Sequence, residues 1–184
     1  MTFDGLDLKA IGMAAAAAIA VAVAGGLLTD IGPWYKSLKQ PRWKPPDWAF
    51  GPIWTVVFTC AATAGVLAWA RAPTDAARYT MVILFAVNGL LNALWSLLYF
   101  RLRRPDWALA ELGLLWLSIV ALIVAMAPYA PTASWLMAPY LVWVSTAGLL
   151  NLATIRLNGP FSGPFAGRSG GPSSGPPSGS AGKR

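Results

Sequence analysis

The sequence predicts an all-α, polytopic membrane protein with a bundle of five transmembrane helices. Of its 184 residues, 57% are hydrophobic and only 11% are charged, and the mean hydropathy is +0.55. The charged residues lie almost wholly between long apolar runs, and each run is close to the roughly 20 residues that a helix needs to cross a bilayer. This pattern suits a water-soluble domain poorly and is typical of a membrane protein.

The apolar runs predict spans at about residues 8–28, 48–70, 79–100, 107–127 and 133–155. Residues 1–158 would then form a single membrane domain. The first run is long and follows an acidic leader with Asp4 and Asp7, which favours a retained helix over a cleaved secretory signal. Gly, Ser and Pro dominate residues 159–184, which predicts a disordered tail that cannot bury a core.

Local residues indicate how several spans begin, bend or pack. Asp47 is placed to cap the second span, and residues 71–78 are expected to form a short loop before the third. Pro139 removes a backbone donor inside the fifth span, where we expect a kink. The first span has small residues at four-residue spacing, which predicts a face for close helix packing: Gly12, Ala16, Ala20 and Ala24.

The cations are divided unevenly between the two sides of the membrane. Five crossings put three on the N-terminal side, namely Lys9, Arg71 and Arg78. Nine lie on the other side, even without Lys183 and Arg184: Lys36, Lys39, Arg42, Lys44, Arg101, Arg103, Arg104, Arg156 and Arg168. The positive-inside rule therefore places the first long loop and the C-terminus in the cytoplasm.

This topology gives a first testable prediction. A reporter fused directly after Arg156 should read as cytoplasmic, because the cation count favours that side by nine to three. An activity-based reporter pair, with one member active only in the cytoplasm and one only outside it, measures the orientation. A non-cytoplasmic signal would reverse the orientation of the whole bundle.

The composition argues against several classes of function. The isoelectric point is near 10, but the cations lie in separate short loops rather than along one stripe, which argues against nucleic-acid binding. Cys60 is the only cysteine, so there is no intrachain disulfide and no zinc cluster. Histidine is absent, which removes the commonest general base, metal ligand and haem axial ligand. We therefore expect no metal site and no bound cofactor.

The stretch from residue 34 to residue 55 stands out between the first two spans. It combines prolines with indoles and cations, and Pro45-Pro46 removes two backbone donors, so we expect this stretch not to be helical. Indoles need apolar cover and a partner for the N–H group. The stretch should therefore fold onto the bundle as a lid, whose expected residues are Trp34, Tyr35, Trp43, Pro45, Pro46 and Trp48.

Polar and indole side chains within the spans converge on one depth beneath this loop. Helical spacing puts Asn88, Asn92 and Trp95 on one face of the third span. The fifth span has a matching face with Trp143, Ala147, Leu150 and Asn151, and Trp54 lies near the same end of the second. Each asparagine alone is best explained by a bond between helices, but together these residues predict a ligand pocket.

Glu111 is the only carboxylate within a predicted span, about one turn into the fourth. A carboxylate is costly in the hydrocarbon region of a bilayer. We expect Glu111 to snorkel to the membrane surface or to pair with an arginine of the adjoining loop.

These motifs resemble the tryptophan-rich sensory protein/translocator protein family (TspO/MBR), also called the peripheral-type benzodiazepine receptor family. The resemblance covers roughly residues 34–158 and rests on tryptophans and prolines in the family's order. The matching segments are Trp34-Tyr35, Pro41 to Trp48, Gly51 to Thr55, Asn92 to Ser96, Pro139 to Trp143, Leu150-Asn151 and Arg156 to Asn158.

The resemblance implies a five-helix bundle, usually a homodimer, with a pocket closed by the first long loop. It implies binding of porphyrins such as protoporphyrin IX, with Trp54 and Trp143 facing the ring and Asn92, Trp95, Ala147 and Leu150 as further walls. The family's sterol-recognition pattern needs an aromatic residue where this chain has Leu152, so sterol binding by that route is not expected. The tail is outside the family pattern.

Three classes of function follow from this resemblance. The leading one is a porphyrin-binding sensor or regulator of tetrapyrrole metabolism and stress response. The second is a transporter of porphyrins or other small hydrophobic ligands, although paired broken helices and a charged pathway are missing from the sequence. The third is a porphyrin-degrading enzyme, in which Trp54 and Trp143 would be the only candidates for catalysis.

Overall fold

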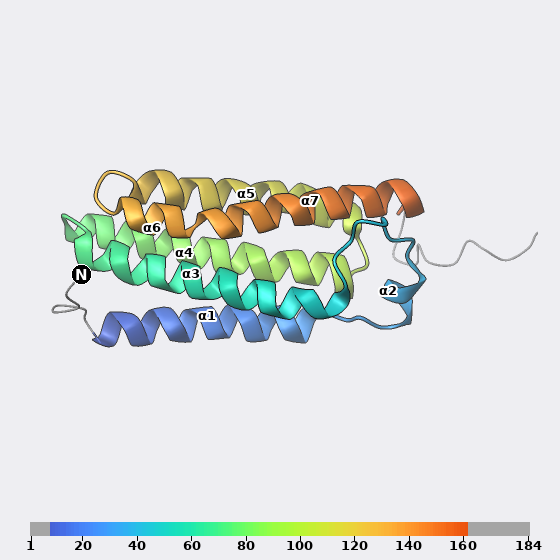
Figure 1. The fold of residues 1–184 in the computed structure, drawn as a ribbon, viewed down its shortest axis with the longest axis horizontal. Helices are drawn as coiled ribbons and strands as arrows, with labels where there is room; N and C mark the ends of the chain where they lie inside the picture. Colours follow the sequence, from blue (N-terminus) through green and yellow to red (C-terminus); the bar gives the residue numbers. More distant parts are fainter. Residues whose placement is uncertain (1–7, 162–184) are drawn as a thin grey trace, which may run out of the picture.

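The computed structural model describes residues 8–161, and these form an elongated bundle of helices without a β-strand (Figure 1). The described elements are α1 (Leu8–Leu28), α2 (Pro33–Ser37), η1 (Asp47–Ala49), α3 (Phe50–Arg71), α4 (Asp75–Ser96), η2 (Leu97–Arg101), α5 (Pro105–Met126), α6 (Pro131–Leu136) and α7 (Ala138–Asn158). The tail from residue 162 lies outside the described residues, so its separation from the membrane domain stays a prediction.

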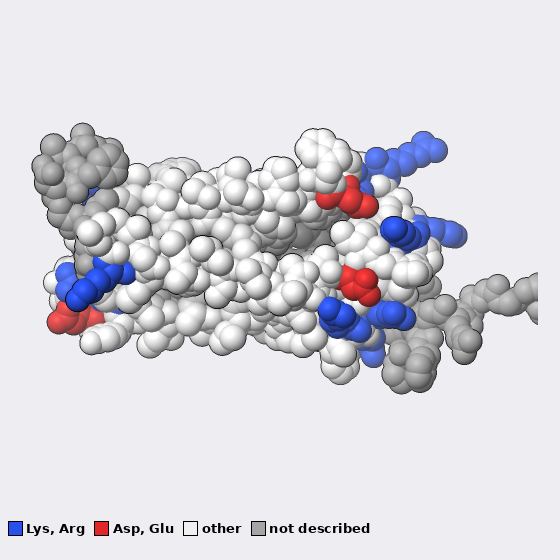
Figure 2. Space-filling model, turned by 90° about the horizontal axis from the view of Figure 1, so that it is seen from below, with Lys and Arg blue, Asp and Glu red and all other residues white. Residues whose placement is uncertain are grey.

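Five helical segments are long and apolar enough to cross a membrane: Leu8–Leu28, Asp47–Arg71, Asp75–Arg101, Pro105–Met126 and Pro131–Asn158. This confirms the predicted fold class. Figure 2 shows the same division on the surface, since Lys, Arg, Asp and Glu gather at the two ends and the long body between them is uncharged. Helix α1 begins at one end of the bundle and α7 finishes at the other, which is also the end where α2 lies (Figure 1).

One predicted helix start and one predicted helix cap were wrong. The third span begins at Asp75 rather than at Tyr79, because the Thr74 hydroxyl accepts a hydrogen bond from the Ala77 N–H group at 3.2 Å and caps the helix. Asp47 does not cap the second span, because its carboxylate pairs with Lys44 instead. Hydropathy marks where a membrane core begins, whereas capping decides where the helix itself begins.

The expected kink at Pro139 is present as a break in the fifth span. Helix α6 ends at Leu136 and α7 starts at Ala138, with the proline in the first turn of α7. Proline cannot donate to the preceding turn, so a new helix starts where the missing N–H group is harmless. The Ser134 hydroxyl donates to the Ile123 carbonyl at 2.9 Å and fixes α6 against α5.

The core lies on the inner face of α5 and continues into α3 and α7. Ile119, Leu122 and Met126 of α5 are fully buried, together with Met137 at the break and Val144 of α7. Helix α1 contributes little to this core, since Ala10 is its only described residue in the buried class. It packs on the outside of the bundle against α3 and α4.

The face through which α1 meets α4 differs from the small-residue face expected from the sequence. Gly12, Ala16 and Ala20 are exposed, and a Cβ atom added at Gly12 would meet nothing within 4 Å. The close approach lies at Gly89 of α4, where an added Cβ would come within 2.8 Å of Val21. Three of the four residues of the small-residue face therefore lie on the surface of the described bundle, and only Ala24 is half-buried.

Substitution of Gly89 gives a second prediction. Gly89→Leu should destabilise the bundle by about 1–3 kcal/mol, because the larger side chain forces α1 away from α4. Thermal unfolding in detergent measures the change. Gly12→Leu is the matched control, since its new side chain has open space around it. Equal losses of stability for the two variants would show that this α1–α4 contact does not depend on close packing.

Candidate ligand-binding site

The aromatic loop folds onto the bundle, as predicted. Trp34 packs edge-on against Tyr99 with ring centroids 6.2 Å apart, and Tyr35 lies 5.7 Å from Phe100. Tyr99 and Phe100 belong to η2, a π-helical turn that ends the third span. The expectation that this stretch contains no helix was wrong for α2, whose Pro33 occupies the first turn, where its missing donor costs nothing.

Asn158 at the end of α7 holds the middle of the loop. Its side-chain oxygen accepts from the Lys39 N–H group at 2.7 Å, and its amide nitrogen donates to the Lys39 carbonyl at 2.9 Å. The same nitrogen also donates to the Thr154 carbonyl at 2.9 Å. One amide side chain therefore fixes the loop backbone to the last turn of α7.

A polar cluster lies under the second half of the loop. The Lys44 ammonium forms an ion pair with Asp47, and it lies 5.3 Å from the Tyr35 ring centroid and 5.9 Å from that of Phe50. Burial opposes the charge on Lys44, but hydrogen bonds to Asp47 and Tyr35 outweigh this effect and raise the pKa of the ammonium. Burial also raises the pKa of the Tyr35 hydroxyl, so the cluster contains one cation, one anion and one neutral phenol.

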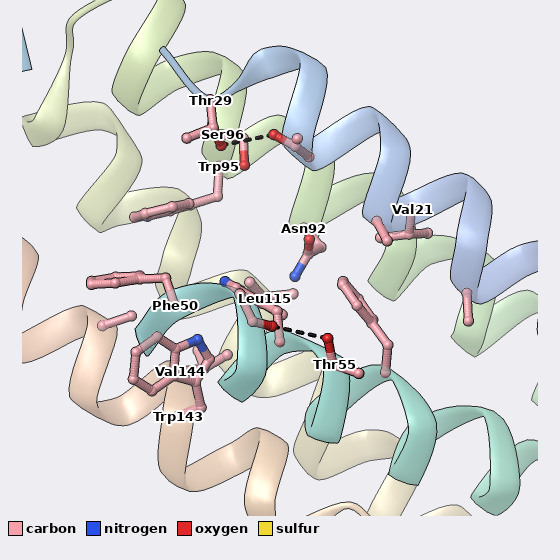
Figure 3. Close-up of a pocket in the computed structure, with 18 of the residues that line it drawn as sticks. Val21, Thr29, Phe50, Thr55, Asn92, Trp95, Ser96, Leu115, Trp143 and Val144 are labelled. Atoms are coloured by element: carbon pink, nitrogen blue, oxygen red, sulfur yellow. Dashed lines mark hydrogen bonds between the residues drawn. The ribbon is translucent and has the colours of Figure 1, made fainter. Parts of the chain in front are cut away.

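Beneath the loop lies a cavity of about 810 Å³. Its aromatic walls come from different helices and include Phe50, Trp54, Phe58, Trp95 and Trp143. Figure 3 shows Phe50, Trp95 and Trp143 around one end of the cavity, with the Asn92 amide pointing into the space between the helices. The volume falls within the roughly 300–1,000 Å³ typical of small-molecule sites.

Trp54 is the centre of the aromatic wall. Its ring stacks on Phe58 with centroids 5.0 Å apart, and it meets Trp143 edge-on at 6.4 Å and Tyr140 at 6.0 Å. Phe50 in turn meets Trp143 at 5.4 Å. Because these rings support one another from two helices, α3 and α7, the wall is preorganised for a flat apolar ligand.

The cavity has few polar groups, and two of them have no partner. The indole nitrogens of Trp95 and Trp143 are buried and make no hydrogen bond. The Asn92 amide donates to the buried Tyr140 hydroxyl at 3.0 Å, which ties α4 to α7 at the same level. A buried N–H group without a partner is costly, so a ligand with acceptor atoms would be favoured here.

One side of the cavity runs along the crevice between α1 and α3. Thr55, Thr59 and Thr63 line it at four-residue spacing, and each hydroxyl donates to the backbone carbonyl four residues earlier. These threonines and Ile19 are also exposed, so the crevice opens on the surface that would face lipid. Figure 2 shows the surface hollowed on this side, toward the end with more charged residues.

Five of the eight ligand-binding residues predicted from the sequence line this cavity: Trp54, Asn92, Trp95, Trp143 and Ala147. Leu150 and Asn151 line a separate smaller cavity instead. Asn88 lies one turn away from Asn92 and donates to the Ser118 hydroxyl at 2.8 Å, so it links α4 to α5. Asn151 likewise links α7 to α5 by donating to the Pro105 carbonyl at 3.0 Å.

Of the six predicted lid residues, only Tyr35 lines either cavity. Tyr35 lines both cavities, whereas Trp34 packs against Tyr99 behind them. Trp43 and Trp48 are 53% and 76% exposed, so their indoles point away from the bundle. Neither they nor Pro45 and Pro46 line either of these two cavities. The main cavity is covered instead by Tyr35, Asp47 and Phe50.

Several lining residues were missed by the sequence reasoning. Phe50 and Phe58 lie four residues before and after Trp54, so the helical period of α3 was a usable signal for both. The α1 wall includes Ala18, Ala22 and Gly26, and such small residues are typical of any transmembrane helix. No local feature distinguishes them as pocket residues.

Glu111 does not behave as expected. Its side chain is 6% exposed and neither carboxylate oxygen has a hydrogen-bond partner, so it neither snorkels nor pairs with an arginine. The adjoining Arg104 is occupied by Asp106, at 2.5 and 2.8 Å. In residues 8–161 no group of three metal-ligating side chains comes together.

Comparison with known proteins agrees with this architecture. The model of the TspO/MBR family matches residues 13–157, which is most of the chain. The chain belongs to the TspO/MBR family.

Its relatives in this family come from distant organisms. The chain is 39% identical to the tryptophan-rich protein TspO of Chlorobaculum tepidum over 129 residues, which cover 68% of this chain and 79% of that protein. It is 33% identical to protein CrtK of Rhodobacter capsulatus, with 77% and 88% covered. It is 30% identical to the human translocator protein, with 68% and 75% covered. The TspO/MBR match includes most of α1, which lies before the sequence segments that carry the resemblance.

Proposed function

We propose that this TspO/MBR protein binds a tetrapyrrole such as protoporphyrin IX in the membrane and acts as a sensor or regulator of tetrapyrrole metabolism and stress response. The observation that carries the proposal is the cavity of about 810 Å³, walled by Trp54, Trp95 and Trp143 with Phe50 and Phe58. A large flat ring system gains both apolar burial and stacking from such walls.

The polar groups of the cavity support the same ligand class. The free N–H groups of Trp95 and Trp143 are donors, and a porphyrin carries ring nitrogens and carboxylates that accept hydrogen bonds. The crevice between α1 and α3 supports entry of a lipophilic ligand from the bilayer, since its exposed residues lie where lipid would be. These features favour a planar, mainly apolar molecule with a few acceptors.

Binding and transport are separated by two measurements on the same preparation. Protoporphyrin IX should quench the tryptophan fluorescence of the purified protein in a saturable way. Vesicles that contain the protein and are loaded with porphyrin should show no protein-dependent flux if the protein only binds its ligand. Protein-dependent flux would instead establish a transporter, and the lack of saturable quenching would refute porphyrin binding.

Degradation is the second alternative, and the close contact of Trp54 with Trp143 is the feature that favours it. Indoles are oxidised far more easily than phenyl rings. The variants Trp54→Phe and Trp143→Phe should therefore lose turnover more steeply than affinity for porphyrin. Product analysis of bound porphyrin in light and in darkness tests this point. Equal losses of binding and turnover would leave the two indoles as walls only.

A further inference from the structure

A second, smaller cavity of about 50 Å³ lies next to the aromatic pocket, under the loop. The two cavities share part of their walls: Tyr35, Phe50, Trp95, Phe100 and Ala147. One buried water needs roughly 10–15 Å³ of such space, so the smaller cavity has room for a group the size of a carboxylate but not for an aromatic ring. It is therefore a side compartment of the main pocket.

Hydrogen-bond donors dominate the polar lining of this compartment. Gln40 Nε2 and Trp95 Nε1 are buried there and have no partner. The Lys44 ammonium adds a cation from the loop side, and its side chain is only 14% exposed. Three other polar groups of the lining have partners: the Thr154 hydroxyl donates to the Leu150 carbonyl, the Tyr35 hydroxyl donates to Asp47, and Asn151 bonds to α5. Free donors and a cation together favour an anionic acceptor.

We propose that this compartment binds a carboxylate of the ligand whose aromatic body fills the main pocket, with Gln40, Trp95 and Lys44 as its hydrogen-bond donors. This inference rests on the proposed function and deepens it, because it selects aromatic acids over neutral aromatic molecules of the same shape. Among the cations of this segment, the proposal gives the role of carboxylate ligand to Lys44 alone. The others, Lys36, Lys39 and Arg42, line neither cavity.

Asp47 is the counter-ion of the Lys44 ammonium. Its carboxylate pairs with Lys44 and accepts from the Tyr35 hydroxyl at 3.4 Å. The Asp47 side chain is 50% exposed, so it can turn toward water when a ligand carboxylate takes its place. Asp47 therefore competes with the ligand for Lys44, and removal of its charge should favour an acidic ligand.

A matched pair of probes tests the proposal: protoporphyrin IX and its dimethyl ester, which has the same ring but no free carboxylate. The wild-type protein should bind the free acid at least roughly tenfold more tightly, as expected for hydrogen bonds to a charged group. Lys44→Met and Gln40→Leu should each reduce this preference by roughly three- to tenfold. Asp47→Asn should increase it. Lys36→Met, on the exposed side of α2, should leave it unchanged.

The outcomes separate this inference from the proposed function. Equal affinity of the wild type for acid and ester, with both still dependent on Trp143, would overturn the carboxylate site and leave the aromatic pocket intact. A loss of preference in Lys36→Met as large as in Lys44→Met would also overturn it, because a diffuse surface charge would then explain the effect. If neither probe binds, both proposals fail. The ester affinity of Lys44→Met and Gln40→Leu reports whether each variant retains a folded pocket.

Discussion

Replacing Trp143 with alanine is expected to weaken protoporphyrin IX binding by about 2–3 kcal/mol, or roughly 30- to 150-fold in the dissociation constant. The indole is 7% exposed and contacts both Phe50 and Trp54, so its removal takes away a ligand contact and loosens the wall. Saturable quenching of tryptophan fluorescence measures the affinity.

Two further variants define what this result means. Trp54→Phe should weaken binding only modestly, because a phenyl ring keeps much of the apolar contact and the stacking. Trp69→Ala should leave the affinity alone, since Trp69 lies in the last turn of α3, against Arg78 and away from the cavity. If Trp69→Ala weakens binding as much as Trp143→Ala, the ligand occupies a different site.

Asn158→Ala should release the loop and speed up ligand dissociation roughly tenfold. The substitution removes both exposed hydrogen bonds to the Lys39 backbone, and the net free energy of such bonds suggests a loss of about 1–2 kcal/mol. The association rate should change much less, because the walls of the pocket on α3, α4 and α7 stay in place. Stopped-flow displacement of bound porphyrin measures the dissociation rate.

The control for the loop is Ser37→Ala. Ser37 donates to the Trp34 carbonyl at 2.7 Å within α2, so its loss is local and does not involve the attachment to α7. Asn158→Asp should fall between the wild type and Asn158→Ala, since a carboxylate still accepts from the Lys39 N–H group but cannot donate. Unchanged dissociation in Asn158→Ala would mean that the loop is not a lid.

The five spans were predictable because the membrane imposes a length and a hydropathy that can be read in a single window of sequence. The break at Pro139 followed from the missing donor of one residue. The start at Asp75 was missed because Thr74 caps the helix outside the apolar run, and the π-helical turn after Ser96 was missed because no residue type specifies it. Local chemistry thus decided details that hydropathy does not contain.

The site was predictable where aromatic and polar residues repeat on one helical face, as Asn92 and Trp95 do. It was not predictable where burial depends on partners from other helices. Asn88 and Asn151 look equivalent to Asn92 in the sequence, and all three bond between helices. Only Asn92 also lines the main cavity, whereas Asn88 bonds to Ser118 and Asn151 to Pro105. The buried position of Glu111 depends in the same way on how α5 packs against its neighbours.

The most direct test of the central claim is an experimental structure of the protein with protoporphyrin IX bound in lipid. We expect the macrocycle to lie inside the cavity of about 810 Å³, between α3 and α7, in contact with both Trp54 and Trp143. Porphyrin on the outer surface of the bundle, with an acyl chain in this cavity, would contradict it.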